Sequence, residues 1–416
     1  MLPSTRRSLP LALCLVVVLL LAGSGAAGFQ SAPQNGSADV VQPQAAPGDI
    51  ALPERVVLSG SETTGSAVVG PDVRASLDRS GSRLDGAYDR YLLQERLAQT
   101  ANDTERSRIL ADTVRGMNDS IHRLHARERT ARLEYLRGDL STRAYLAELR
   151  AINDEAEALR RLADDIDPID TQSEGYVDRY AASEASIELG TLRGDIIALR
   201  GPVRSQVGGA MTAERGPRRV YVKASENGTI LSTIDGTTYH REAHRNDLLV
   251  GGSQRGISPT ELADLTVEEL YPVYRSHYDF GAVGQGISGQ FYLILGEGAL
   301  NYEHGALRSY VDAVSQTVFW EYQRMDLDSD LPLGTARTNA SGDLSVSVRP
   351  TYATGPARVS VSDGAQAAAN VTVSVNGTVV AETNAEGTAW VVVPTNGSTV
   401  SVTAGGDSAT VPVRWE

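Results

Sequence analysis

The sequence of 416 residues contains a single cysteine, Cys14, and a single lysine, Lys223. Cys14 lies in the first apolar segment, and without that segment the chain has neither a disulfide nor a thiol nucleophile. Acidic residues outnumber basic residues 52 to 38, which gives a formal net charge of −14. This charge excludes a general nucleic-acid binder, because such a protein must neutralise phosphates.

Motifs of nucleotide and acyl-transfer enzymes are also missing. The glycines of 281–286 do not form a G-x-G-x-x-G loop, and the sequence has no G-x-S-x-G nucleophile elbow. With no thiol beyond Cys14, a catalytic triad has no anchor in the sequence. We therefore predict a protein that is not an enzyme and needs no cofactor, apart from a weak case for calcium described below.

The N-terminus has the three regions of a secretory signal. Arg6 and Arg7 precede an apolar run over 9–22, and small residues follow over 23–28. The run is short for a transmembrane helix, which needs about 20 residues. The sequence predicts a signal peptide over 1–27 and an exported, extracellular or cell-surface protein. Membrane attachment through an uncleaved N-terminal segment is the alternative, and the export route, Sec or twin-arginine, stays open.

Glycosylation sequons support export independently. Eight of the twelve asparagines begin N-x-Ser/Thr, whereas random placement gives about two. Hairpin turns of the Asn-Gly type explain some of these sites without a sugar. We nevertheless predict a glycoprotein, with candidate sites at Asn35, Asn102, Asn118, Asn227, Asn339, Asn370, Asn376 and Asn396.

The first half of the chain is predicted to be a linker followed by helices. Residues 28–70 are rich in Pro, Gly, Ser and Gln, which predicts a disordered linker. Over 71–170 two heptad patterns flank a turn at Gly138, which predicts an antiparallel helical hairpin of coiled-coil type. Glu128 is the one charged residue in the first apolar seam. A partly helical connector is expected over 171–217.

An α+β domain with two related halves is predicted over 218–327. The pattern Arg-x-Tyr-Val-x-Ala occurs at 219–224 and again at 308–313, each time before a turn and a second alternating segment. Between the copies, Ser258 and Glu261 form a capping box that opens a helix. The form Tyr-Val-x-Ala, turn, Thr-Ile-Leu over 221–231 resembles PepSY-like domains. That resemblance implies a small exported module associated with peptidases.

The C-terminal residues 333–416 alternate apolar and polar positions in short segments separated by Asn-Gly and Gly-Gly turns. This spacing predicts an all-β sandwich. The segments 371–379 and 383–394 resemble Ig-like and carboxypeptidase-regulatory-like modules. The whole resembles uncharacterised exported proteins of halophilic archaea, so the fold class expected is a multidomain α and β protein: helical hairpin, central α+β domain and C-terminal sandwich.

Two groups of side chains are weak candidates for metal binding. His240 and His244 lie four residues apart, on one face of either a helix or a strand, and could share a metal with Glu242 nearby. Asp326, Asp328 and Asp330 alternate as in a calcium loop. Leu331 and Arg337 occupy positions where an EF-hand needs glycine and glutamate, so only a weaker calcium site remains.

The function predicted is that of a non-enzymatic, glycosylated surface protein that mediates protein-protein or envelope contacts. Its partners would be other envelope or secreted proteins, with a peptidase among them and no nucleic acid. A coiled-coil homo-oligomer is a further expectation. Two alternatives stay open: a PepSY-like inhibitor or chaperone of a secreted peptidase, and a metal-dependent hydrolase that uses His240 and His244.

Overall fold

The computed structural model describes residues 56–166, 184–250, 261, 265, 269, 291–296 and 305–414, except 313, 332, 353–354 and 394–396. The predicted signal peptide and most of the predicted linker lie outside these residues. So do the glycosylation candidates Asn35 and Asn396. Of the helix expected from Ser258, only residues 261, 265 and 269 are described.

The helices predicted from the apolar periodicity are present. They are α1 (Val73–Gln99), α2 (Asp103–Arg137) and α3 (Thr142–Ile166), followed by α4 (Glu184–Leu199) and α5 (Pro202–Met211) in the predicted connector. Asn102 caps α2 by accepting hydrogen bonds from the Thr104 and Glu105 N–H groups. Gly138, with φ of 82°, ends α2 in the left-handed conformation that glycine adopts without strain.

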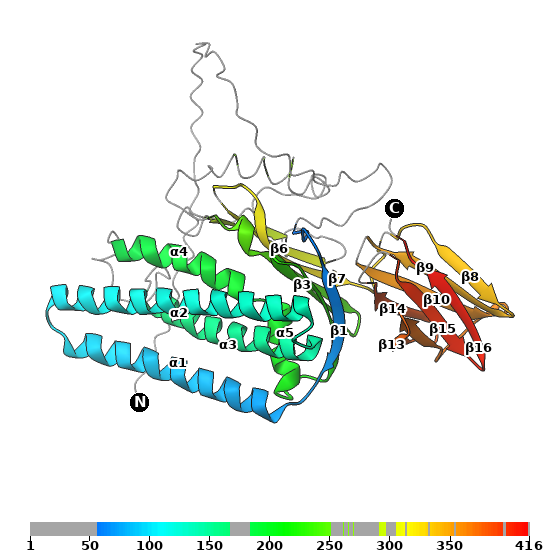
Figure 1. The fold of residues 1–416 in the computed structure, drawn as a ribbon, viewed down its shortest axis with the longest axis horizontal. Helices are drawn as coiled ribbons and strands as arrows, with labels where there is room; N and C mark the ends of the chain where they lie inside the picture. The colour runs from blue at the N-terminus through cyan, green and yellow to red at the C-terminus, as the bar shows by residue number, and fades with distance from the viewer. Residues whose placement is uncertain are drawn as a thin grey trace, which may run out of the picture. The chain divides into compact units, whose positions relative to one another are not determined.

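The heptad seam of α2 is buried as predicted. Its buried positions are Leu110, Val114, Met117, Ile121, Leu124, Glu128, Ala131 and Tyr135, with Arg132 beside them. Those from Leu110 to Leu124 share a core with apolar residues of α1, α3 and α4, and the four helices lie side by side in Figure 1. The seam therefore closes a helical bundle, and a separate coiled coil is not shown.

Beside the bundle lies a seven-stranded antiparallel sheet in the order β1-β2-β3-β4-β7-β6-β5. The strands are β1 (Thr63–Val69), β2 (Arg218–Ala224), β3 (Gly228–Asp235), β4 (Thr238–Arg245), β5 (Phe291–Gly296), β6 (Gly305–Asp312) and β7 (Val318–Asp326). The two copies of the repeated pattern fall on β2 and β6. Each is the second strand from an edge of the sheet, and β4 lies between β3 of one half and β7 of the other.

Two predicted boundaries need correction. Residues 63–69 belong to the expected linker, yet they form β1 and pair with β2 along its whole length. Helices and sheet were predicted as separate domains, but one core contains Tyr145 and Leu146 of α3, Val203 of α5 and Val220 of β2. Neither the sheet face nor the helical stripe can be buried alone, so 63–69 and both regions fold as one body.

The C-terminal region is the predicted β-sandwich. One sheet contains β8 (Arg337–Ser341), β9 (Leu344–Pro350), β10 (Pro356–Asp363), β11 (Gln366–Ala367) and β14 (Thr388–Val392). The other contains β12 (Thr372–Val375), β13 (Thr378–Glu382), β15 (Thr399–Ala404) and β16 (Asp407–Pro412). Alternate valines of both sheets, among them Val346, Val359, Val373 and Val402, form the core between them.

Candidate functional site

Five charged or titratable side chains meet in the interior, where α2 and α5 pack against β4. We call Glu128, Arg132, Arg204, Glu242 and His244 the buried ionic cluster. Each is 3% exposed or less. With both carboxylates ionised and His244 neutral, the charges of the two carboxylates and the two guanidinium groups cancel.

Arg204 lies at the centre of the cluster. Its Nη2 is 3.0 Å from Glu128 Oε1, and its Nε is 3.1 Å from Glu242 Oε1. His244 Nε2 is 2.5 Å from Glu128 Oε1, while Arg204 Nη2 lies 3.0 Å from His244 Nδ1. A carboxylate can only accept and a guanidinium can only donate, so neutral His244 with its proton on Nε2 satisfies both neighbours.

The pKa values follow from burial and from these contacts. Burial alone raises the pKa of Glu128, but Arg204 and His244 outweigh it and hold that pKa well below its ordinary value. Burial raises the pKa of Glu242, in spite of Arg204 beside it. Burial lowers the pKa of His244 to about 4, and the cation of Arg204 acts in the same direction.

The lowered pKa of His244 predicts loss of stability in acid. The unfolded chain binds a proton at His244 below pH 6.5, whereas the folded chain binds it only near pH 4. The contribution of neutral His244 to the free energy of unfolding is therefore complete above pH 6.5 and is lost as the pH falls towards 4. At 1.36 kcal/mol per pKa unit, we expect a loss of roughly 3 kcal/mol in the free energy of unfolding. Urea titrations at pH 7 and pH 4.5 measure it.

Two histidine variants isolate this effect. Gln in place of His244 can donate to Glu128 and accept from Arg204 without titrating, so His244→Gln should flatten the dependence of stability on pH. His240 also has a pKa lowered to about 4 by burial, so part of the slope should remain. The exposed His122 supplies the control, and His122→Gln should keep the full slope. An unchanged slope in His244→Gln would contradict the assignment.

Glu242 has a second task, because it caps α5 from a distant strand. Gly201 precedes the helix and offers no side-chain cap. Glu242 Oε2 instead accepts hydrogen bonds from the N–H groups of Val203 (2.8 Å) and Arg204 (3.3 Å). Asn153 of α3 accepts from the Gly201 N–H at 3.0 Å. The start of α5 is thus held by the sheet and by α3 together.

A second polar site is open to solvent. It is a groove of about 370 Å³ between α1 and α3, close to the start of α5. Five arginines line it and two carboxylates, Asp154 and Glu157, face them. The arginines are Arg79, Arg83, Arg90, Arg161 and Arg200.

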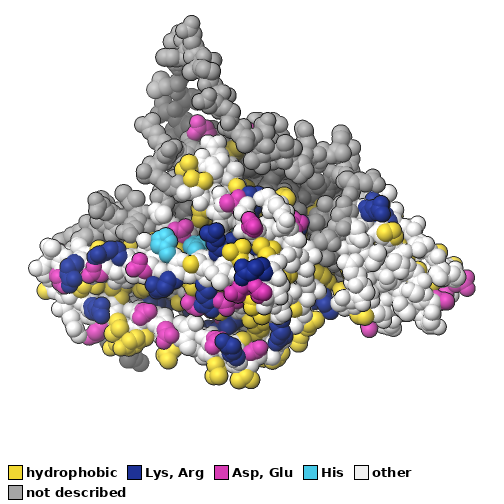
Figure 2. Space-filling view, in the orientation of Figure 1, with side chains coloured by type: hydrophobic (Ala, Val, Ile, Leu, Met, Phe, Trp, Pro, Cys, Tyr) yellow, Lys and Arg dark blue, Asp and Glu magenta, His cyan; other side chains and the backbone are white. Residues whose placement is uncertain are grey.

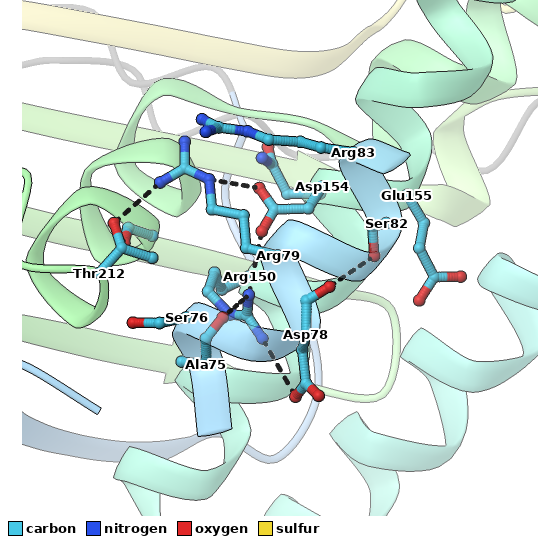
Figure 3. Close-up of polar contacts among 12 residues, drawn as sticks. Ala75, Ser76, Asp78, Arg79, Ser82, Arg83, Arg150, Asp154, Glu155 and Thr212 are labelled. Atoms are coloured by element: carbon cyan, nitrogen blue, oxygen red, sulfur yellow. Dashed lines mark hydrogen bonds and ion pairs between the residues drawn. The ribbon is translucent and has the colours of Figure 1, made fainter. Parts of the chain in front are cut away.

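Hydrogen bonds and ion pairs link the walls of the groove. Arg79 reaches Thr212 Oγ1 at 3.1 Å and Asp154 at 3.8 Å (Figure 3). Below it, buried Arg150 donates to the Ala75 carbonyl at 3.1 Å and lies 3.7 Å from Asp78. Burial raises the pKa of Asp154, in spite of the neighbouring arginines.

Two arginines of the groove keep their guanidinium groups near solvent. Arg83 is 55% exposed and lies 3.6 Å from Glu214. Arg161 is 48% exposed and bonds Glu157 at 3.3 Å. Guanidinium groups bind carboxylates and phosphates in bidentate geometry, so the groove can receive an acidic group.

The predicted metal ligands are placed in separate surroundings. His240 and His244 share a face of β4, but His240 Nδ1 is 2.8 Å from the Tyr322 hydroxyl, while His244 belongs to the buried ionic cluster. A third ligand would have to come from another histidine such as His277 or His304, and both are outside the described residues. Where the structure is described, no three His, Asp or Glu side chains are arranged to hold a metal ion.

The acidic run after β7 forms a turn. Asp326 Oδ1 accepts from the Asp328 N–H at 3.1 Å, and the Asp326 carbonyl accepts from Ser329. Asp326, Asp328 and Asp330 are exposed. Asp326, the first of the three carboxylates predicted to bind calcium, therefore already accepts a hydrogen bond within the turn.

Sequence reasoning missed the buried ionic cluster, although one signal was present. Glu128 interrupts an otherwise apolar seam, and a charged residue at such a position needs a buried partner. That partner, Arg204, is 76 residues away in the connector. Spacing along the chain gives no indication of such a contact.

The comparisons with known proteins describe the same three regions. Residues 220–330 match the Family of unknown function (DUF7094), and residues 335–411 match the Archaeal fibronectin-III type-like domain. The latter confirms the predicted Ig-like sandwich, whereas the PepSY resemblance of 221–231 finds no counterpart. Neither the curated proteins nor the solved structures yielded a match. Among the described helices, none combines the length and the apolar character needed to cross a bilayer.

The remaining match covers the helices and β1. It extends over residues 5–216, which is just over half of the chain, and it ends directly before β2. The boundary between the two matched regions therefore runs through a single folded body, because β1 on one side pairs with β2 on the other. The chain belongs to the family described as Domain of unknown function (DUF7096).

Proposed function

We propose that this chain is an exported, glycosylated, non-enzymatic surface protein that makes contacts with other proteins or with the cell envelope. The observation that carries the proposal is the C-terminal archaeal fibronectin-III type-like module, a kind of module typical of surface proteins. The secretory pattern of residues 1–27 and the excess of sequons support it.

The distribution of charged groups also supports a contact function. The buried ionic cluster is closed to solvent, so no substrate reaches His244 or Glu242 in the folded protein. The arginine-lined groove is open, and its guanidinium groups pair with carboxylates of the same chain. An acidic group on a partner can exchange with those carboxylates, which makes the groove our candidate contact surface.

The sequons differ in how well they can carry a glycan. Six of them are described, and none has a buried asparagine. Asn102 uses its side-chain oxygen to cap α2, which leaves the amide nitrogen for a glycan. Asn370 is exposed in a turn. Asn227 is less suitable, because Thr229 of its sequon is fully buried and bonds the Tyr145 hydroxyl at 2.7 Å.

The mass of the secreted protein tests the proposal. We expect loss of the first 27 residues and added glycan mass, with Asn102 and Asn370 modified and Asn227 unmodified. Peptide mapping of the secreted chain locates each glycan. Variants Asn102→Gln and Asn370→Gln should each remove one glycan, whereas Asn227→Gln should leave the mass otherwise unchanged. A soluble intracellular protein that retains residues 1–27, or a secreted chain without glycan, would overturn the proposal.

A further inference from the structure

Helix α1 exposes an unusual number of large apolar side chains. The described residues include nine exposed large hydrophobic side chains, and five of them lie on this one helix. Figure 2 shows hydrophobic side chains gathered along the lower edge of the view, where α1 lies in Figure 1. The five are Val73, Leu77, Leu84, Tyr88 and Tyr91, and each is between 58% and 78% exposed.

Four of these residues form one regular stripe. Leu77, Gly81, Leu84, Tyr88 and Tyr91 follow each other at intervals of four, three, four and three residues, which is the seam of a coiled coil. We call these five positions the outer stripe. The opposite face of α1 is already packed, since Ala75 and Leu93 are buried and Gly86 lies against Ala158 of α3. Helix α1 thus has two apolar faces, and the described part of the chain covers only one of them.

We propose that a second copy of this chain covers the outer stripe, with the two α1 helices packed antiparallel. The proposal is independent of export and of the function proposed above, because it rests on the surface of α1 alone.

The stripe is complementary to itself in that arrangement. Antiparallel pairing about a point between Gly81 and Leu84 places Leu84 of each copy opposite Gly81 of the other, where the missing side chain leaves room. The same register places Leu77 opposite Tyr88. At the ends it brings Arg74, which is 91% exposed, over the ring of Tyr91, a favourable cation–π contact. Leu84 therefore meets a glycine, and the two tyrosines meet a leucine and an arginine instead of each other.

The flanking charges disfavour a lipid surface as the occupant. Helices that lie in a membrane interface carry Lys and Arg beside the apolar face. The exposed charged residues of α1 are Asp78, Asp85, Asp89 and Glu95 against Arg74, Arg83 and Arg96, so acidic residues outnumber basic ones. Helix α1 thus lacks the excess of basic residues that attracts anionic headgroups, whereas a second copy offers an apolar face of the same length.

The size of the stripe sets the expected affinity. Covering the five exposed side chains on both copies removes on the order of 1,000 Å² from water, at the lower limit of specific interfaces. We therefore expect a dimer that dissociates at concentrations of about 1–100 µM. Because Asp78 and Asp85 flank the stripe on both copies, salt should strengthen the dimer by screening them.

Sedimentation of the processed full chain between about 1 and 300 µM tests the proposal. We expect a shift from monomer to dimer across this range, at lower concentration in high salt. The variant Leu84→Glu should remain monomeric throughout, since it buries a charge at the centre of the pair. Leu84 is 70% exposed, so this change leaves the fold of the monomer intact. Val379→Glu, at a 54% exposed position in β13, is the matched control and should dimerise normally.

Single introduced cysteines report the relative orientation of the two α1 helices, because the chain without the predicted signal peptide has no cysteine of its own. In the antiparallel pair each Leu77 faces Tyr88, while the two copies of Leu77 are about 16 Å apart at 1.5 Å per residue. Mild oxidation should therefore cross-link an equimolar mixture of Leu77→Cys and Tyr88→Cys chains, and neither variant alone. A chain that is monomeric at every concentration, a Leu84→Glu dimer, or cross-linking of each single variant with itself would overturn the proposal.

Discussion

Methionine in place of Arg204 is expected to lower the free energy of unfolding by about 3–5 kcal/mol, the cost of removing one partner from a buried ion pair. Arg204 is the only group of the buried ionic cluster that contacts both carboxylates, Glu128 and Glu242. Without it, Glu128 keeps only the more distant Arg132, at 3.8 Å, and the neutral His244. Urea unfolding at pH 7, followed by circular dichroism, measures the loss.

The matched control is the same substitution on the surface. Arg129 is an exposed residue of α2, and Arg129→Met should change stability by no more than about 0.5 kcal/mol. Adding Glu128→Gln to Arg204→Met removes the stranded charge, so the double variant should be less destabilised than the sum of the two single variants. Additive single effects, or an Arg204→Met protein as stable as Arg129→Met, would contradict the role assigned to Arg204.

The helices could be predicted closely because their signals are local. The seam from Leu110 to Tyr135 extends over most of α2. Gly138 marks the end of the helix, since glycine adopts the left-handed backbone conformation required there. Burial of a stripe on a long helix depends on residues three or four positions apart, which the sequence displays directly. The positions of α4 and α5 were less well defined, because the apolar residues of α4 surround the helix instead of forming a stripe.

The sheet could be predicted only in part. Alternation along the sequence predicted β2, β3 and β6, and the repeated pattern falls on the second strand from each edge of the sheet. It could not give the pairing of β4 with β7, whose partners are about 80 residues apart, as in His240 and Arg324. Strand β1 was missed because its sequence, Thr63–Val69, is short and only half-buried, and its pairing with β2 crosses the whole helical bundle in sequence.

The candidate sites were the least predictable part of the protein. His240 and His244 were noticed as a pair because they are close in sequence, yet their contacts are with Tyr322 and Glu128, which lie far along the chain. Similarly, the arginines of the groove come from α1, α3 and the start of α5. Charged residues carry no periodic signal of their own, so only the fold shows which of them meet.

The substitution Gly201→Ala is expected to destabilise the protein by about 3 kcal/mol, the upper range for overpacking a full interior. A Cβ atom at Gly201 would lie 1.9 Å from Glu242 Cδ and 2.0 Å from its Oε2. The carboxylate cannot move aside freely, because it caps α5 through the Val203 N–H and pairs with Arg204. Thermal and urea unfolding of the variant measure the effect.

The same substitution at Gly116 should have the opposite sign. Gly116 is exposed within α2 and no atom lies within 4 Å of the Cβ position, so alanine there gains up to about 1 kcal/mol from its higher helix propensity. If the clash with Glu242 causes the loss at Gly201, Gly201→Ala should cost less in a Glu242→Ala background than in the native chain. An equal cost in both backgrounds would show that the alanine acts through the backbone of Gly201. The close packing of Gly201 against the Glu242 carboxylate would then not be what fixes the start of α5.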